Sequence, residues 1–179
     1  LTLVLPALNY ADSAALPPLH TPALDELLRF GSFSRRACAP SELYARYLWR
    51  GSLLAQAKAA VGVAAAQPAV LAAPVWQQMG MHHMNMLSGA DIQIASAEAE
   101  RLCRELSGFY HDDGFRFAAV RPDLWLLEMP QTPDWQAVPL WDVLGRVDGT
   151  VRAEGAGSAQ WLQLQTEMQM WLHSHALNA

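Results

Sequence analysis

A segment near the middle of the chain constrains the fold most, because its apolar residues recur at helical spacing. Ser96 is a good N-cap for this helix, and Glu98 follows in the first turn, where the helix dipole favours acidic side chains. Gly108 and the turn at residues 112–114 end it. We therefore expect one buried helix face, made of Ala99, Leu102, Cys103, Leu106 and Tyr110.

Strand-like runs lie on both sides of this helix. After it, apolar residues alternate with Arg116 and Ala118, and the turn signal Arg121-Pro122-Asp123 separates this run from the next. Residues 91–94 alternate as well. The main predicted strands are residues 70–78 and 81–87 before the helix, joined around Gly80, and residues 115–119 and 124–129 after it. This order of strand, strand, helix, strand, strand predicts an α+β fold with a mainly antiparallel sheet and flanking helices.

Further helices are predicted before and after this centre. Thr21-Pro22 has the form of an N-cap followed by proline at the first helical position, and Gly31 ends that helix. Ser41 is expected to cap a second helix, and Ser158 is expected to cap the last one. The alanine-rich residues 57–69 either extend the second helix or connect it to the next element, and both interpretations stay open.

The composition is that of a globular domain with a substantial core. Of the 179 residues 52% are hydrophobic, so we expect a single α+β domain over residues 1–179. The net charge of −5 argues against a nucleic-acid surface, since phosphate contacts need clustered positive charge. Cys38 and Cys103 are too few for a disulfide framework, which favours a cytoplasmic protein. No apolar run reaches the roughly 20 residues that span a bilayer, so no membrane association is expected.

Histidines supply the candidate metal ligands. His173 and His175 lie on the last predicted helix, but residues two apart on a helix point about 200° apart and cannot share one metal ion. His82 and His83 lie among methionines, and such a cluster suits a soft metal such as copper. Methionine packing and surface histidines are the commoner explanations of these patterns, so we expect no bound metal.

Two short patterns could hold a phosphate group. Asp12-Ser13 is the dipeptide of the metal-bound nucleophile in alkaline-phosphatase-like enzymes, although their partner carboxylate and histidine motifs are not visible. Arg35 and Arg36 could hold a phosphate or carboxylate through paired N–H donors, and Trp76 is a candidate for the lining of that ligand site. The chain has no glycine-rich phosphate loop, no Gly-x-Ser-x-Gly and no His-Glu-x-x-His motif.

Packing and turn motifs are spread along the chain at residues 3–8 (LVLPAL), 111–117 (HDDGFRF), 122–127 (PDLWLL) and 167–178. Together they resemble the RpfE-type bacterial regulatory protein family. The resemblance implies a largely uncharacterised protein, linked by its name to the regulation of pathogenicity factors and sometimes labelled phosphoglycerate-mutase-like. Many members carry Asp-Pro-Val-His where this chain has Ala73-Pro74-Val75-Trp76, so no role of that Asp or His carries over.

The resemblance also implies a longer protein, because family members continue beyond this helix into a tryptophan-rich segment. We therefore expect this chain to be the N-terminal part of a longer protein. The apolar stripe of the last helix would then lack its neighbour, and we expect it to contact a protein partner or a second copy of the chain. The predicted interface residues are Trp161, Met168 and Trp171.

These observations favour a cytoplasmic regulatory or binding protein without catalytic activity. Its expected partners are a small anionic ligand, another protein or a further copy of itself. The alternative is a phosphoglycerate-mutase-like phosphotransfer enzyme that needs a divalent metal and uses Asp12 and Ser13. A third possibility, a purely structural subunit, predicts no pocket with convergent polar groups.

Overall fold

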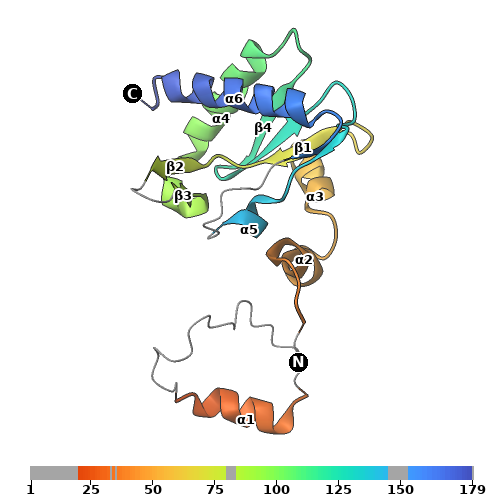
Figure 1. The fold of residues 1–179 in the computed structure, drawn as a ribbon, viewed down its shortest axis with the longest axis vertical. Helices are drawn as coiled ribbons and strands as arrows, with labels where there is room; N and C mark the ends of the chain where they lie inside the picture. Colours follow the sequence, from red (N-terminus) through yellow and green to blue (C-terminus); the bar gives the residue numbers. More distant parts are fainter. Residues whose placement is uncertain (1–19, 33, 35, 80–83, 145–152, 179) are drawn as a thin grey trace.

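The computed structural model describes residues 20–32, 34, 36–79, 84–144 and 153–178. Within these residues the protein has the predicted α+β fold, with helices on both faces of a small antiparallel sheet (Figure 1). The main sheet contains, among the described residues, β1 (Ala69–Ala72), β5 (Leu124–Glu128) and β4 (Arg116–Arg121), side by side in that order. Both neighbouring pairs are antiparallel, as predicted.

The central strand β5 is buried on both faces. Leu126 and Leu127 are 0% and 1% exposed, and successive side chains of a strand point to opposite faces of the sheet. Leu127 belongs to a core shared with α4 (Ser96–Phe109) and α6 (Ser158–Ser174), whereas Leu126 packs with Ala57 of α3 (Leu53–Ala60). The sheet therefore lies between α3 on one side and the pair α4 and α6 on the other.

The hairpin of β4 and β5 confirms the turn predicted at residues 121–123. The Arg121 guanidinium pairs with the Asp123 carboxylate (2.9 Å), and the Trp125 indole N–H donates to the Pro122 carbonyl (3.1 Å). Ser107 holds α4 against this hairpin, because its hydroxyl oxygen accepts from the Phe117 backbone N–H (2.8 Å). Helix and hairpin are thus joined by a polar contact as well as by apolar packing.

The predicted buried face of α4 is confirmed, since all of its members are at most 5% exposed: Ala99, Leu102, Cys103, Leu106 and Tyr110. Burial raises the pKa of the Cys103 thiol to about 12, so this thiol stays neutral and acts as a small core residue. Phe117, Trp125 and Met129 of the hairpin and its flank complete the same core. This packing joins α4 to the sheet.

Two of the predicted N-caps are wrong by one residue. Ser96 and Ser158 are the first residues of their helices, and the N-cap positions belong to Ala95 and Gly157. Neither alanine nor glycine has a side-chain acceptor, so neither supplies the capping bond that a serine would. At α4 the Glu98 carboxylate compensates in part, because it accepts from the Ala95 backbone N–H (2.8 Å).

The cap predicted at Ser41 is also wrong, for a different reason. α2 (Pro40–Tyr44) follows Ala39, and the hydroxyl and backbone N–H of Ser41 donate to the Asp142 carboxylate (2.5 and 2.8 Å). Asp142 belongs to α5 (Leu140–Val143), which is distant in sequence. A π-helical turn, η1 (Ala45–Trp49), continues α2 and places Trp49 against Trp141 with ring centroids 4.9 Å apart. Long-range contacts thus replace the expected local cap.

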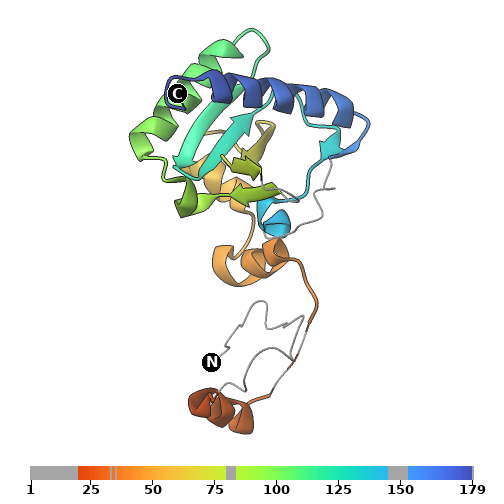
Figure 2. The ribbon, with the colours of Figure 1, turned by 60° about the vertical axis from the view of Figure 1, so that its left-hand side comes forward.

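The first predicted helix begins at its proline and ends before its glycine, as expected. α1 (Pro22–Phe30) begins after Thr21 and ends before Gly31, and it lies apart from the sheet (Figure 2). α3 is capped by Ser52, whose hydroxyl accepts from the Ala55 N–H (3.2 Å). Residues 57–69 do not extend the second helix, because residues 57–60 belong to α3, a separate helix, and a connector then leads to β1.

The strand predicted at residues 70–78 is two strands. β1 ends at Ala72, and β2 (Trp76–Met79) begins after Pro74, which lacks the N–H that a continuous sheet strand needs. β2 pairs with β3 (Met84–Leu87) as expected, but β1 pairs with β5. The prediction of an alternating strand at residues 91–94 is wrong. Residues 91 and 92 belong to η2 (Gly89–Ile92), a 3-10 turn that satisfies its backbone locally.

The last helix, α6, covers the same side of the sheet as α4. Its half-buried residues Trp161, Leu164, Met168 and Trp171 pack on the core around β5, which confirms the predicted apolar stripe. A short pair of strands, β6 (Trp135–Gln136) and β7 (Glu154–Gly155), precedes it. Within the described residues, no helix combines the length and the apolar character that a bilayer crossing requires.

The C-terminal end of α6 is tied to α4 through a buried histidine. The Leu177 backbone N–H donates to His175 Nδ1 (3.2 Å), so Nε2 is the ring nitrogen that carries the hydrogen. His175 Nε2 donates to Glu105 Oε2 (2.8 Å), and Arg101 Nε donates to Glu105 Oε1 (2.7 Å). The bonds from Arg101 and then His175 lower the pKa of the Glu105 carboxyl from its ordinary 4.5 to about 2.

This contact predicts a pH-dependent part of the stability. Because the pKa of Glu105 is lower in the folded state, the unfolded chain takes up the proton first as the pH falls below 4.5. The stabilisation is therefore complete above pH 4.5 and is lost as the pH falls toward 2. We expect the urea midpoint of wild type to fall more steeply over this range than that of Glu105→Gln.

Glu100→Gln is the matched control, because Glu100 is exposed on the same helix. It should keep the wild-type pH dependence. Equal slopes for wild type and Glu105→Gln would contradict the proposed linkage.

Candidate functional site

Several of the residues predicted as site candidates lie outside the described part of the chain. These are Asp12, Ser13, Arg35, His82 and His83. The phosphotransfer alternative, the weak soft-metal candidates and half of the arginine pair are therefore untested. Two of the three ligand-binding candidates, Arg36 and Trp76, lie within the described residues. Arg36 is exposed and pairs with Glu42 (2.9 Å), whereas Trp76 is 58% exposed on β2.

The histidine candidates on α6 differ from each other. His173 is exposed, whereas His175 is buried and uses both ring nitrogens in bonds to Leu177 and Glu105. Its ring also lies 4.9 Å from that of Trp171. His175 thus acts as a structural link between two helices. Among the described residues, no three His, Cys, Asp or Glu side chains come together in a group that could hold a metal ion.

The predicted interface residues lie on the inner side of α6. Trp161, Met168 and Trp171 are half-buried and pack on the protein's own core. The stripe therefore has a neighbour within the chain. A missing neighbour, which was the reason to expect a partner at this face, is not found in the described fold. An interface with another protein or a second copy stays a prediction.

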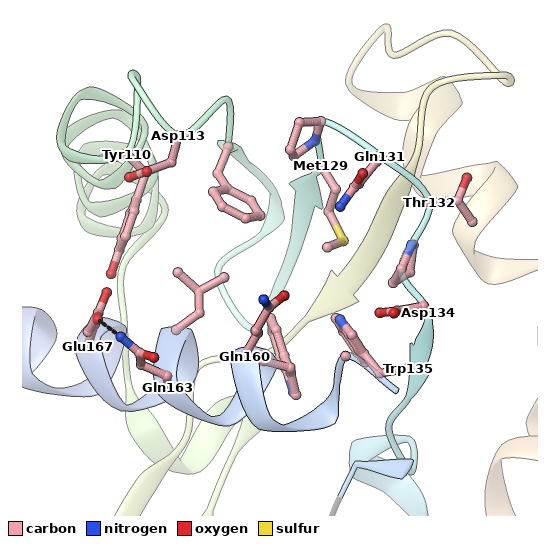
Figure 3. A pocket seen from close by; sticks show the side chains of 16 residues that line it. Tyr110, Asp113, Met129, Gln131, Thr132, Asp134, Trp135, Gln160, Gln163 and Glu167 are labelled. Atoms are coloured by element: carbon pink, nitrogen blue, oxygen red, sulfur yellow. Dashed lines mark hydrogen bonds between the residues drawn. The ribbon is translucent and has the colours of Figure 1, made fainter. Parts of the chain in front are cut away.

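A pocket of about 300 Å³ lies beside this core, between the end of α4, the segment after β5 and the first half of α6 (Figure 3). This volume is at the small end of the range typical of ligand sites. Phe115, Met129 and Leu164 supply apolar lining, and Trp135 and Trp161 stack on each other with ring centroids 4.1 Å apart. The pocket therefore combines a wall of stacked aromatic rings with further apolar lining.

A tight turn after α4 positions the residues at one end of the pocket. The Tyr110 carbonyl accepts from the backbone N–H groups of Asp113 (3.2 Å) and Phe115 (3.3 Å). Gly114 has φ +77°, a left-handed conformation that glycine adopts without strain, and a Cβ at this residue would lie 3.2 Å from that of Pro130. This close approach brings the turn against the segment that follows β5.

The Tyr110 hydroxyl is the most unusual polar group of the pocket. Tyr110 is 2% exposed, and its hydroxyl is buried without a hydrogen-bond partner within the described residues. In Figure 3 the ring extends from the end of α4 toward α6, with its hydroxyl beside the Glu167 side chain. Burial, together with the negative charges of Glu167 and Asp113, raises the pKa of Tyr110, so the hydroxyl stays protonated.

Carboxylates and carboxamides form most of the polar lining. Gln163 donates to the Glu167 carboxylate (3.1 Å), and Asp113 lies at the opposite side of Tyr110 (Figure 3). Asp134 lies over Gly157, where a Cβ would overlap its carboxylate, so glycine lets the acid approach the positive end of the α6 dipole. Gln131 and Gln160 add two amides, and no lysine, arginine or histidine lines the pocket among the described residues.

The sequence predictions missed this site for a clear reason. Helical spacing predicts that Tyr110 lies on the apolar face of a helix, and the burial of its ring confirms this. The spacing does not reveal where the hydroxyl group lies. The lining comes from residues 110–115, 129–135 and 157–167, which are brought together only by the fold. One signal was available, namely that the hydroxyl of a buried tyrosine normally needs a partner.

No family model matches this chain, and no curated protein or solved structure is significantly similar to it. The geometry of the pocket is therefore the basis for any functional conclusion. The resemblance to the RpfE-type family stays a prediction that rests on the quoted residues alone.

The partnerless hydroxyl predicts an unusual response to mutation. Tyr110→Phe removes no hydrogen bond to the protein, so the free energy of unfolding should stay within about 1 kcal/mol of wild type or rise. Ser107→Ala is the contrasting variant, because it leaves the Phe117 N–H without its acceptor. It should lower the free energy of unfolding by about 1–3 kcal/mol. Urea denaturation measures both values, and a larger loss for Tyr110→Phe than for Ser107→Ala would contradict the assignment.

Proposed function

We propose that this protein is a non-catalytic binding protein that takes a small ligand into the pocket between α4 and α6. The observation that carries the proposal is the hydroxyl of Tyr110, a residue of the pocket lining; this hydroxyl is buried and has no partner among the described residues. A buried polar group left unpaired costs about 1–3 kcal/mol, so a ligand that bonds to it gains affinity. The surrounding amides and carboxylates add further hydrogen-bonding groups.

The character of the lining supports binding over catalysis. Covalent catalysis uses a nucleophile within hydrogen-bond reach of an activating base. Among the described lining residues, the one side-chain hydrogen bond joins Gln163 to Glu167, and the Gln163 amide is not a nucleophile that Glu167 could activate. A phosphate group would also meet Asp113, Asp134 and Glu167 without a lining cation, which disfavours the phosphotransfer alternative at this pocket.

A regulatory role is compatible with such a site, because ligand binding here would bridge two elements. Tyr110 directly follows α4, and Glu167 belongs to α6. A ligand that contacts both would stabilise their packing and any surface that depends on it. The separate proposal of an anionic ligand on Arg35, Arg36 and Trp76 concerns another part of the chain.

A fragment screen tests the proposal, because it covers ligands of every charge class. Cationic, neutral and anionic fragments are added to ¹⁵N-labelled protein, and the indole N–H signals of Trp135 and Trp161 are followed by NMR. We expect binding fragments to shift these two signals, because both rings line the pocket. The response should weaken in Gln160→Trp, which fills the space, and persist in Gln165→Trp, on an exposed part of the same helix. If no fragment of any charge shifts the two signals, the pocket is not a binding site.

A further inference from the structure

We infer that the pocket recognises an organic cation, namely an alkylammonium or guanidinium group whose alkyl part packs on the aromatic wall. This inference rests on the proposed binding function and adds the chemical class of the ligand. It starts from the charge of the lining, which includes Asp113, Asp134 and Glu167 and no basic side chain among the described residues. A site of this composition attracts positive charge and repels negative charge.

The position of the Tyr110 hydroxyl also favours a cation. Its oxygen is buried, lacks a partner among the described residues and lies beside the Glu167 side chain (Figure 3). An ammonium group carries three N–H donors, so it can donate to a neutral phenol oxygen and to a carboxylate at the same time. A cation at this position would therefore satisfy the tyrosine and neutralise the nearby acid together.

The carboxylates do not form a metal site. Within the described residues, no group of three acidic or other ligating side chains could hold one metal ion. They are instead spread around a space of about 300 Å³, and Asp134 already lies at the positive end of α6. Such a space fits a small organic group better than a bare divalent ion, which needs its oxygen ligands at about 2.0–2.6 Å.

The aromatic lining favours a cation that carries an apolar chain. Trp135 and Trp161 form a stacked pair at the wall, and Phe115 and Leu164 line the space beside it. Aromatic faces attract ammonium and guanidinium groups, and methylene groups gain from burial against them. Both a free amine and a basic side chain of a peptide have this chemistry.

A matched ligand series tests the inference. The probes are N-acetyl-lysine methylamide and N-acetyl-arginine methylamide, with the norleucine analogue as the neutral control and the glutamate analogue as the anionic control. Cadaverine represents free amines.

Dissociation constants are measured by NMR titration at low salt, using the Trp135 and Trp161 signals. We expect at least one cation to bind about tenfold or more tightly than the norleucine analogue, and the glutamate analogue to bind more weakly still. Tighter binding of the peptide mimics than of cadaverine identifies a basic side chain as the source, and the reverse identifies a free amine.

Variants assign the effect to the pocket. Glu167→Gln keeps the size of the side chain and should weaken cation binding about tenfold, while the neutral analogue is unaffected. Tyr110→Phe should also weaken cation binding. The control Glu100→Gln, on the exposed side of α4, should bind like wild type. Because the acids are exposed, cation binding should also weaken as salt is raised from about 10 mM to about 150 mM.

The possible failures are distinguishable. Neutral or anionic probes that bind as tightly as the cations overturn the inference and leave the binding function intact. Unchanged cation affinity in Glu167→Gln overturns it as well. The absence of binding by probes and fragments of every charge overturns the binding function itself.

Discussion

The burial of β5 on both faces is the constraint on which the rest of the structure depends. Leu126 and Leu127 face opposite sides and are both fully enclosed, so each side of the sheet needs its own cover. α3 supplies one cover with Ala57, and α4 and α6 supply the other. Because β1 and β4 pair with the two edges of β5, the backbone of this strand is satisfied as well.

The pocket follows from how α6 meets this core. One side of the helix packs on the sheet through Trp161, Leu164 and Met168, while Gln160, Gln163 and Glu167 project toward the space beside α4. The Glu105–His175 contact holds the far end of α6 against α4. Tyr110 lies where core and pocket meet, so its ring stabilises the fold, while its buried hydroxyl lacks a partner among the described residues. The same residue therefore connects the stability of the protein with its proposed function.

Local patterns in the sequence predict local structure well. The α4 face and the β4–β5 hairpin follow from spacing and turn residues within a few positions of each other. The predicted caps at Ser96 and Ser158 are misplaced by one residue because a cap depends on backbone angles that residue type alone does not determine. The prediction for Ser41 fails because its partner, Asp142, is about a hundred positions away. The pocket could not be predicted for the same reason, since residues near 110, 130 and 160 meet only in the folded chain. The pairing of β1 with β5, in place of the predicted strand at residues 81–87, also joins residues that are far apart in the sequence.

In the binding mode that we propose, the Tyr110 hydroxyl and the Glu167 carboxylate together receive a cation. The most direct test is an experimental structure of the protein with saturating cadaverine. We expect an ammonium nitrogen within about 3.2 Å of the Tyr110 hydroxyl oxygen and close to the Glu167 carboxylate. An amine bound elsewhere, or a Tyr110 hydroxyl bonded only to protein groups in that structure, would contradict it.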